Sequence, residues 1–255
     1  MEPGSNISEP AFSDERERAW LALLLGWVAG FADAFGYLVL NEIFTSHISG
    51  NSVAVGAEAG RRNWDIAGQH AWPILFFIFG FFVGVVLETI CARLHVRRRL
   101  GVVLVLEMIL LVVFFFFGWT WEHSPGIAPN VSPHFYFLVA LLAGAMGVQS
   151  AGLRHVRGQS VHTPYVTGML THAVEDAVKV LFKVYDRLRH RVADFPFEEF
   201  KRIRFFAGVW FSFTVGAVCG GIGESHWSFY ALFAPLAVLL AIIVCDLAQP
   251  IHNEN

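Results

Sequence analysis

Six apolar blocks, each long enough to cross a lipid bilayer as a helix, restrict the fold of this 255-residue chain more than any other feature. The hydrocarbon core of a bilayer is about 30 Å thick and takes about 20 helical residues to cross. With 55% of its residues hydrophobic and 15% charged, the chain has the composition of a protein solvated by lipid. We therefore predict an all-α membrane protein with six transmembrane helices, near residues 20–40, 72–93, 100–121, 135–155, 205–223 and 229–247.

Two further segments, residues 47–60 and 164–186, can form helices without crossing the membrane. The first is too short to span a bilayer. The second carries His172, Glu175 and Asp176 among other polar side chains, and such groups are costly in contact with lipid. We expect each segment to be a short re-entrant or interfacial helix that follows the first span of its half of the chain.

The Lys and Arg residues set the expected orientation. With six crossings and an inside N-terminus, all 18 of them except Arg61 and Arg62 fall on the cytoplasmic side. If the two short segments were also crossings, six of these basic residues would move outside. The stronger bias favours six crossings in a cell inner (plasma) membrane with both termini cytoplasmic. Residues 1–17 are expected to form a disordered tail, and residues 249–255 a C-terminal tail.

An internal repeat divides the chain into two halves, residues 18–123 and 124–248. Two pairs of segments carry it, at spacings of 117 and 118 residues: 30–34 (GFADA) with 147–151 (GVQSA), and 45–51 (TSHISGN) with 163–169 (TPYVTGM). Each half holds three crossings, which is an odd number, so the second half must enter the membrane from the opposite side. We therefore expect two inverted three-helix repeats, an arrangement common in secondary transporters.

Two stretches that contain these repeats resemble the signatures of the YoaK-like family of bacterial membrane proteins: GFADAFGYLVLNEIFTSHISGNSVAVG and GVQSAGLRHVRGQSVHTPYVTGMLTHAVEDAV. The resemblance covers roughly residues 20–247. It implies a bacterial six-helix inner-membrane protein. It implies no substrate, because the family is a domain of unknown function.

Polar residues of the first crossing and of the two turns form the expected path for a solute or ion. Asp33 lies near the middle of the first span, where an ionised carboxylate must face water or have a partner. In the turns, Ser or Thr can cap a helix N-terminus, and Gly lets the backbone approach a solute closely. The path residues are therefore Asp33, Thr45, Ser49, Gly50, Asn51, Gln149, Ser150, Thr163, Thr167 and Gly168. The structural alternative is that these residues only pack helices together and cap backbone groups.

Five further side chains are secondary candidates: Glu58, Glu107, His172, Glu175 and Asp176. Glu107 raises the same question as Asp33, because it lies within the third span. The other candidates on residues 164–186 are three to four positions apart on one helix, a spacing that could hold a metal ion. Because this spacing is a common coincidence, we expect a solvated helix face and no metal site.

The chain contains no Walker loop, dinucleotide fingerprint, GxSxG elbow or HExxH helix. We therefore expect no enzyme activity, no cofactor and no nucleic-acid partner. The sequence favours a small secondary transporter or channel-like permease, embedded in the lipid bilayer, for an unidentified small solute or ion. The alternative is a non-transporting membrane scaffold or sensor, and a homodimer is compatible with the small-residue helix faces.

Overall fold

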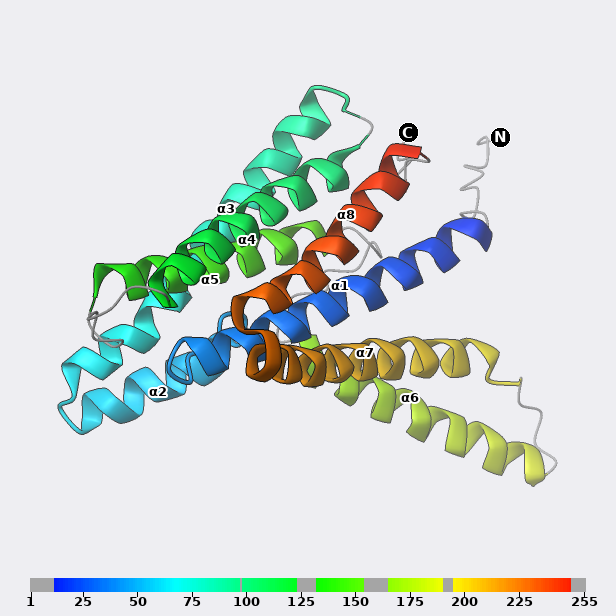
Figure 1. Cartoon of the computed structure of the whole chain (residues 1–255). Helices are drawn as coiled ribbons and strands as arrows, with labels where there is room; N and C mark the ends of the chain where they lie inside the picture. The colour runs from blue at the N-terminus through cyan, green and yellow to red at the C-terminus, as the bar shows by residue number, and fades with distance from the viewer. Residues whose placement is uncertain (1–11, 97, 123–131, 154–164, 190–194, 249–255) are drawn as a thin grey trace.

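The computed structural model describes residues 12–96, 98–122, 132–153, 165–189 and 195–248, and within these ranges it contains helices and no β-strand. In chain order the helices are α1 (Phe12–Val39), α2 (Ile48–Gly60), α3 (Trp64–Arg93), α4 (Arg99–Glu122), α5 (Pro133–Leu153), α6 (Tyr165–Leu188), α7 (Phe197–Trp227), the 3-10 helix η1 (Ser228–Leu232) and α8 (Phe233–Ala248). Figure 1 shows α2 beside the start of α3, and α6 beside the start of α7, at opposite ends of the molecule.

Five segments of the described chain are long and apolar enough to cross a membrane. Four of them are single helices, namely Ala19–Val39 within α1 and the whole of α3, α4 and α5. The fifth, Phe197–Ala248, contains α7, η1 and α8 and is 52 residues long. The chain reverses direction within it at η1, where Ser228 has a positive φ of 47° (Figure 1). The architecture is that of an all-α membrane protein.

Three helices differ from the sequence expectation in length. Residues 12–17, expected in a disordered tail, begin α1, which continues without a break into the first apolar span. The helices α3 and α7 each begin well before the predicted spans at residues 72 and 205, because their first turns extend along α2 and α6. The two intervening helices occupy the predicted short segments, but α6 has 24 residues where α2 has 13.

Glycines bring α1 and α7 into direct backbone contact. A Cβ atom added at Gly30 of α1 would overlap the carbonyl oxygen of Phe213 in α7. In the reverse direction, a Cβ atom at Gly216 would overlap the carbonyl oxygen of Trp27. Small residues at such positions let membrane helices approach closely enough for van der Waals packing to hold them together.

The helices α3 and α5 cross in the same way. A Cβ atom at Gly147 of α5 would overlap the carbonyl oxygen of Phe77, and one at Gly80 of α3 would overlap that of Gly144. The contacts between α1 and α7 and between α3 and α5 are the most extensive helix contacts among the described residues. We call these helix pairs the α1–α7 and α3–α5 crossings, as distinct from membrane crossings.

The residues that touch in the α1–α7 crossing correspond one by one to those that touch in the α3–α5 crossing. Positions in α1 and α5 differ by 117, so that Gly30 corresponds to Gly147. Positions in α3 and α7 differ by 136, so that Gly80 corresponds to Gly216. The pairs that touch also correspond under these offsets: Gly30–Phe213 with Gly147–Phe77, Gly216–Trp27 with Gly80–Gly144, and Gly220–Phe31 with Gly84–Val148.

The helix α5 lies in the interior and contacts α1, α3 and α4. Its side chains from Leu138 to Leu153 are almost all buried. A group of aromatic rings from three other elements, Phe35 of α1, Phe114 of α4 and Phe229 of η1, completes the core, with ring centroids 5.6–6.3 Å apart. Leu40 and Ile43, which lie between α1 and the polar residues that follow it, belong to the same core.

Candidate functional site

The carboxylate of Asp33 is buried in α1 and organises the turn that follows the helix. Its Oδ1 accepts hydrogen bonds from the backbone N–H and hydroxyl of Thr45, both at 3.0 Å, and from the backbone N–H of Ser46 at 2.9 Å. Its Oδ2 accepts from the Ser46 hydroxyl at 2.8 Å and contacts Nδ1 of His47. Charge-assisted bonds of this kind are stronger than neutral ones, so Asp33 holds residues 45–47 against the helix.

The chain folds back to Asp33 because of the residues between the helix and the bonded turn. After α1 ends at Val39, Asn41 and Glu42 have positive φ angles of 53° and 61°, which turn the chain sharply. Leu40 and Ile43 on either side are fully buried and anchor the turn in the core. The polar groups of residues 45–47 are thereby carried to the buried carboxylate.

His47 closes the turn on the exposed side. Its side chain is 42% exposed, whereas that of Asp33 is 5% exposed. The hydrogen bond to Asp33 raises the pKa of His47 above its usual value, outweighing the opposite effect of partial burial. The pair therefore joins a buried acid to a histidine that reaches the surface.

The start of α2 contains the other first-half candidates, in different environments. Asn51 is fully buried, and its Nδ2 donates to the carbonyl oxygen of Phe44 at 2.6 Å while its Oδ1 has no hydrogen-bond partner. Ser49 is exposed, and Gly50 is half-buried, with the Phe44 ring 3.3 Å from where a Cβ atom would lie. The structure therefore brings Asp33 and Thr45 together directly, with Asn51 one helical turn beyond.

The second-half candidates make separate contacts. Gln149 is buried in α5; its Nε2 donates to the carbonyl oxygen of Leu25 in α1 at 2.7 Å, and its Oε1 has no partner. The Ser150 hydroxyl donates to the carbonyl oxygen of Met146 at 2.8 Å. Gly168 lies in the first turn of α6 and has open space where a side chain would be. Thr163 lies outside the described residues, and Thr167 belongs to α6.

The secondary candidates on α2 and α6 form surface and interhelical pairs. Glu58 accepts from Arg61 at 2.9 Å and from Asn63 at 2.7 Å. Glu175 pairs with Lys179 at 2.7 Å and lies 3.8 Å from His172. No group of three or more His, Cys, Asp or Glu side chains within the described ranges could hold a metal ion.

Asp176 is a buried acid that joins α6 to α7. Its carboxylate accepts from Arg202 at 2.9 and 3.1 Å and from Lys179 at 3.3 Å. Burial acts to raise the pKa of Asp176, but the bonds from the two cations outweigh it and hold that pKa below its usual value. A second pair, Lys183 with Glu199 at 2.7 Å, reinforces the contact between the two helices.

Sequence reasoning did not identify Ser46, His47 and Asp246 as candidates. Ser46 and His47 lie within the repeated segment at residues 45–51, so their position in that segment is the signal that could have found them. Asp246 is 1% exposed in α8, and its Oδ2 lies against Gly101 of α4. Its position near the end of an apolar block gives no indication of burial.

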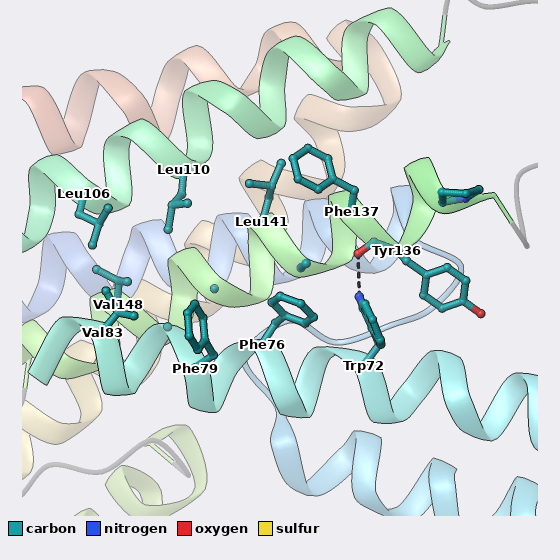
Figure 2. A pocket seen from close by; sticks show the side chains of 14 residues that line it. Trp72, Phe76, Phe79, Val83, Leu106, Leu110, Tyr136, Phe137, Leu141 and Val148 are labelled. Carbon is teal, nitrogen blue, oxygen red and sulfur yellow. Dashed lines mark hydrogen bonds between the residues drawn. The ribbon is translucent and has the colours of Figure 1, made fainter. Parts of the chain in front are cut away.

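A cleft of about 860 Å³ lies between α3, α4 and α5. Figure 2 shows its lining, which is mainly apolar and includes Phe76, Phe79, Leu106, Leu110 and Val148. Its polar contact is a hydrogen bond from Nε1 of Trp72 to the carbonyl oxygen of Tyr136 at 2.8 Å (Figure 2). The cleft is suited to apolar groups and is separate from the turn at Asp33, whose bonded residues do not line it.

A buried polar turn inside a bundle of apolar helices defines the class of this protein as an all-α membrane protein. The model of the family described as "Protein of unknown function (DUF1275)" matches residues 21–245, so the chain belongs to that family. The chain is also 22% identical over 230 residues to the "UPF0700 transmembrane protein YoaK" of Bacillus subtilis (strain 168), covering 89% of this chain and 93% of that protein. The predicted YoaK-like resemblance is therefore confirmed. No solved structure matches the chain.

Proposed function

We propose that this protein is a small secondary transporter or channel-like permease for a small solute or ion, built from two inverted three-helix repeats. The observation that carries this proposal is the residue-by-residue correspondence between the α1–α7 and α5–α3 crossings. Two halves that pack through equivalent glycines can exchange conformations, and this exchange underlies alternating access in transporters with inverted repeats. Transport, rather than catalysis, is the activity that such an arrangement serves.

The proposed opposite orientation of the two halves depends on six membrane crossings in the inner (plasma) membrane. A continuous helix of 52 residues would be about 78 Å long, more than twice the thickness of a hydrocarbon core. The reversal at Ser228 therefore supports α7 and α8 as separate crossings. Each half then has three crossings, and the distribution of basic residues supports cytoplasmic termini.

The solute path is proposed to pass the turn at Asp33 in the first half and the start of α6 in the second. Two features of the described residues support it. Asn51 carries a fully buried amide oxygen without a hydrogen-bond donor, which a solute could supply. Gly168, at the equivalent position to Gly50 in the repeat, has open space around it.

One observation favours the alternative, a non-transporting scaffold or sensor. Every hydrogen bond described for the Asp33 carboxylate comes from the adjacent turn, as expected if the residue only fixes the chain after α1. Both functions need this turn to be folded. They differ in whether anything crosses the membrane.

A flux panel on purified protein in liposomes tests the proposal, using cations, anions, amino acids and small metabolites. The informative variant is Gly168→Leu, because the open space around Gly168 accommodates a larger side chain without disturbing the described helices. Gly56→Leu is its matched control, since Gly56 on α2 is also surrounded by open space and lies outside the proposed path.

Flux of at least one solute that Gly168→Leu removes and Gly56→Leu retains would establish a permease and locate its path. Asp33→Asn is tested beside it, with a measurement of thermal stability. Loss of flux without loss of stability would show that the carboxylate takes part in transport and does not only hold the turn. If folded wild-type protein passes none of the solutes, the transporter proposal fails and the scaffold or sensor role is favoured.

A further inference from the structure

Glu107 is a buried acid within the core of the protein. It lies in α4 with no exposed surface, and neither of its carboxylate oxygens has a hydrogen-bond partner. Asp33 and Asp176, by contrast, are buried acids that receive several bonds from nearby donors. An ionised carboxylate without a partner is very unfavourable in an apolar interior, so Glu107 needs a bound positive charge or a proton of its own.

A second buried acceptor lies at the same end of the contact between α4 and α5. Figure 2 shows Leu106 and Leu110 of α4 in the opposite order to Leu141 and Val148 of α5 along the cleft, so the two helices run antiparallel. A Cβ atom added at Gly152 of α5 would lie 3.2–3.3 Å from Leu100 and Val103 of α4. In antiparallel helices Glu107, one turn after Val103, and Gln149, one turn before Gly152, lie on the same side of that contact. The Oε1 of Gln149 also has no hydrogen-bond donor, while its Nε2 is occupied by the carbonyl oxygen of Leu25.

The unpartnered polar atoms of these two side chains are therefore all acceptors. A proton on Glu107 converts one carboxylate oxygen into a donor and removes the buried negative charge in a single step. A monovalent cation could satisfy the same oxygens, and the experiment below distinguishes the two. A structural role gives no reason for a glutamate here, because a leucine or glutamine would bury no charge.

Charged groups on the neighbouring elements do not neutralise Glu107. The described part of α5 contains no Asp, Glu, Lys or Arg, and neither does η1. On α8 the charged residue is Asp246, which lies against Gly101. On α3 the charged residues are Asp65, Glu88 and Arg93, with His70 as a further titratable group, and none of them bonds to Glu107.

We propose that Glu107 is a proton-binding site that holds a proton when it is buried and exchanges it when α4 and α5 separate. This proposal deepens the proposed function and rests on it, because it makes the proton the coupling ion of the transporter. The proton leaves to water, and the carboxylate remains until it is protonated again. Gln149 is a positioning residue, whose amide oxygen can accept the hydrogen bond of the protonated acid.

Infrared spectroscopy of the purified protein in lipid tests the protonation directly and needs no transport. The carbonyl stretch of a protonated carboxylic acid is separate from the bands of carboxylates and amides. We expect wild-type protein at neutral pH to show this band, Glu107→Gln to lose it, and Glu122→Gln to keep it. Glu122 is an exposed glutamate at the end of the same helix, so it is the matched control.

The proposal is overturned if wild-type protein lacks the band at neutral pH or if Glu107→Gln retains it. It is also overturned if the band appears only after Na⁺ is removed, which would make the site a cation site. Should Glu107→Gln fail to fold, Glu107→Asp keeps the carboxylic acid and is expected to shift the band; an unchanged band would assign it to another residue.

A transport measurement separates this proposal from the general one. For a solute that crosses in the flux panel, Glu107→Gln is expected to lose the response to an imposed pH gradient while exchange of that solute continues. Retained pH-driven uptake in the variant would overturn the role of Glu107 and leave the permease intact. Absence of all flux would remove the permease, while the infrared result would still decide whether Glu107 holds a proton.

Discussion

The α1–α7 and α3–α5 crossings share their glycines and differ in their polar residues. Gly30 and Gly147 occupy equivalent positions, and so do Gly216 and Gly80. Three residues beyond the first pair, however, the α1 helix has Asp33 where α5 has Ser150. Close backbone contact demands the same small residue in both halves, whereas the buried charge is needed in only one. The halves are therefore alike in packing and unlike in chemistry.

The same comparison explains where the apolar cleft lies. Trp72 and Phe76 of α3 line it, and the equivalent residues of α7 are Gly208 and Ser212. The Ser212 hydroxyl donates to the carbonyl oxygen of Leu23 at 2.7 Å, and the small Gly208 lets α7 lie against α1. Bulky aromatic side chains in the first half hold open a space that small residues close in the second.

The largest expected difference between the halves comes from removing the polar side chains at equivalent positions. Asp33→Ala is expected to lower the free energy of unfolding by about 3–5 kcal/mol, because it leaves the donors of residues 45–47 buried without their acceptor. Ser150→Ala is expected to cost about 1 kcal/mol, since its hydroxyl donates one described bond, to a backbone carbonyl. Thermal denaturation in detergent measures both.

Ala34→Ser, next to Asp33 in the same helix, is a control for changes at this level of α1. Equal costs for Asp33→Ala and Ser150→Ala would contradict the asymmetry, and would mean that the turn is held by its packing around Leu40 and Ile43.

The turn shows how far the sequence determines the site. The repeat and the cost of a buried carboxylate identify Asp33, Thr45 and Asn51, all of which are buried in the structure. They do not reveal His47 as the partner of Asp33, because that contact depends on the positive φ angles at Asn41 and Glu42. Local sequence does not determine which of several nearby donors a sharp turn will bring to the acid.

The sequence likewise predicts only part of the pairing between helices. The repeat search aligns Gly30 with Gly147, but it does not extend to Gly80 and Gly216, whose spacing is 136 rather than 117 residues. The longer α6 helix, with 24 residues against 13 in α2, changes the register between the halves. Because the extra residues change the spacing, the correspondence between α3 and α7 is visible in the structure but not in the sequence repeat.

Equal losses are expected when the shared glycines are replaced. Gly30→Ala and Gly147→Ala should each lower the free energy of unfolding by about 3 kcal/mol, because the added methyl group overlaps a backbone carbonyl that cannot rotate away. Gly56→Ala is the control: it meets no atom within 4 Å and should stabilise α2 by about 0.5–1 kcal/mol. A loss in only one crossing would show that the halves do not pack equivalently.

A smaller difference is expected between the ion pairs that join α6 to α7 and those beside α2. Asp176→Asn should lower the free energy of unfolding by about 1 kcal/mol at most, because Arg202 is 44% exposed and solvent screens the pair. Glu58→Gln should have less effect, since its partner Arg61 is 71% exposed.

The pH dependence of the Asp176 pair has a definite sign. Because its pKa is lowered in the folded protein, the stability it contributes is present above the unfolded pKa of about 3.9 and is lost as the pH falls through the folded value. Acid denaturation of wild type and Asp176→Asn should therefore converge at low pH. Curves that stay a constant distance apart would show that the loss arises from packing.

The smallest expected effect is a pH-dependent step that belongs to the first half alone. The bond to Asp33 raises the pKa of His47, so the stability it contributes is fully present below the unfolded pKa of about 6.5 and is lost as the pH rises through the folded value. The equivalent residue in the repeat is Tyr165, so the second half has no histidine at this position. Subtracting the melting curve of His47→Gln from that of wild type, at pH values on both sides of this window, isolates the step.

Because His47 is half exposed, the step should be small, and its absence would mean that the imidazole contacts Asp33 without carrying a charge. Its presence would place a titrating pair at the exposed end of the turn, where deprotonation of His47 weakens its bond to Asp33 and loosens the first half while the second half stays packed.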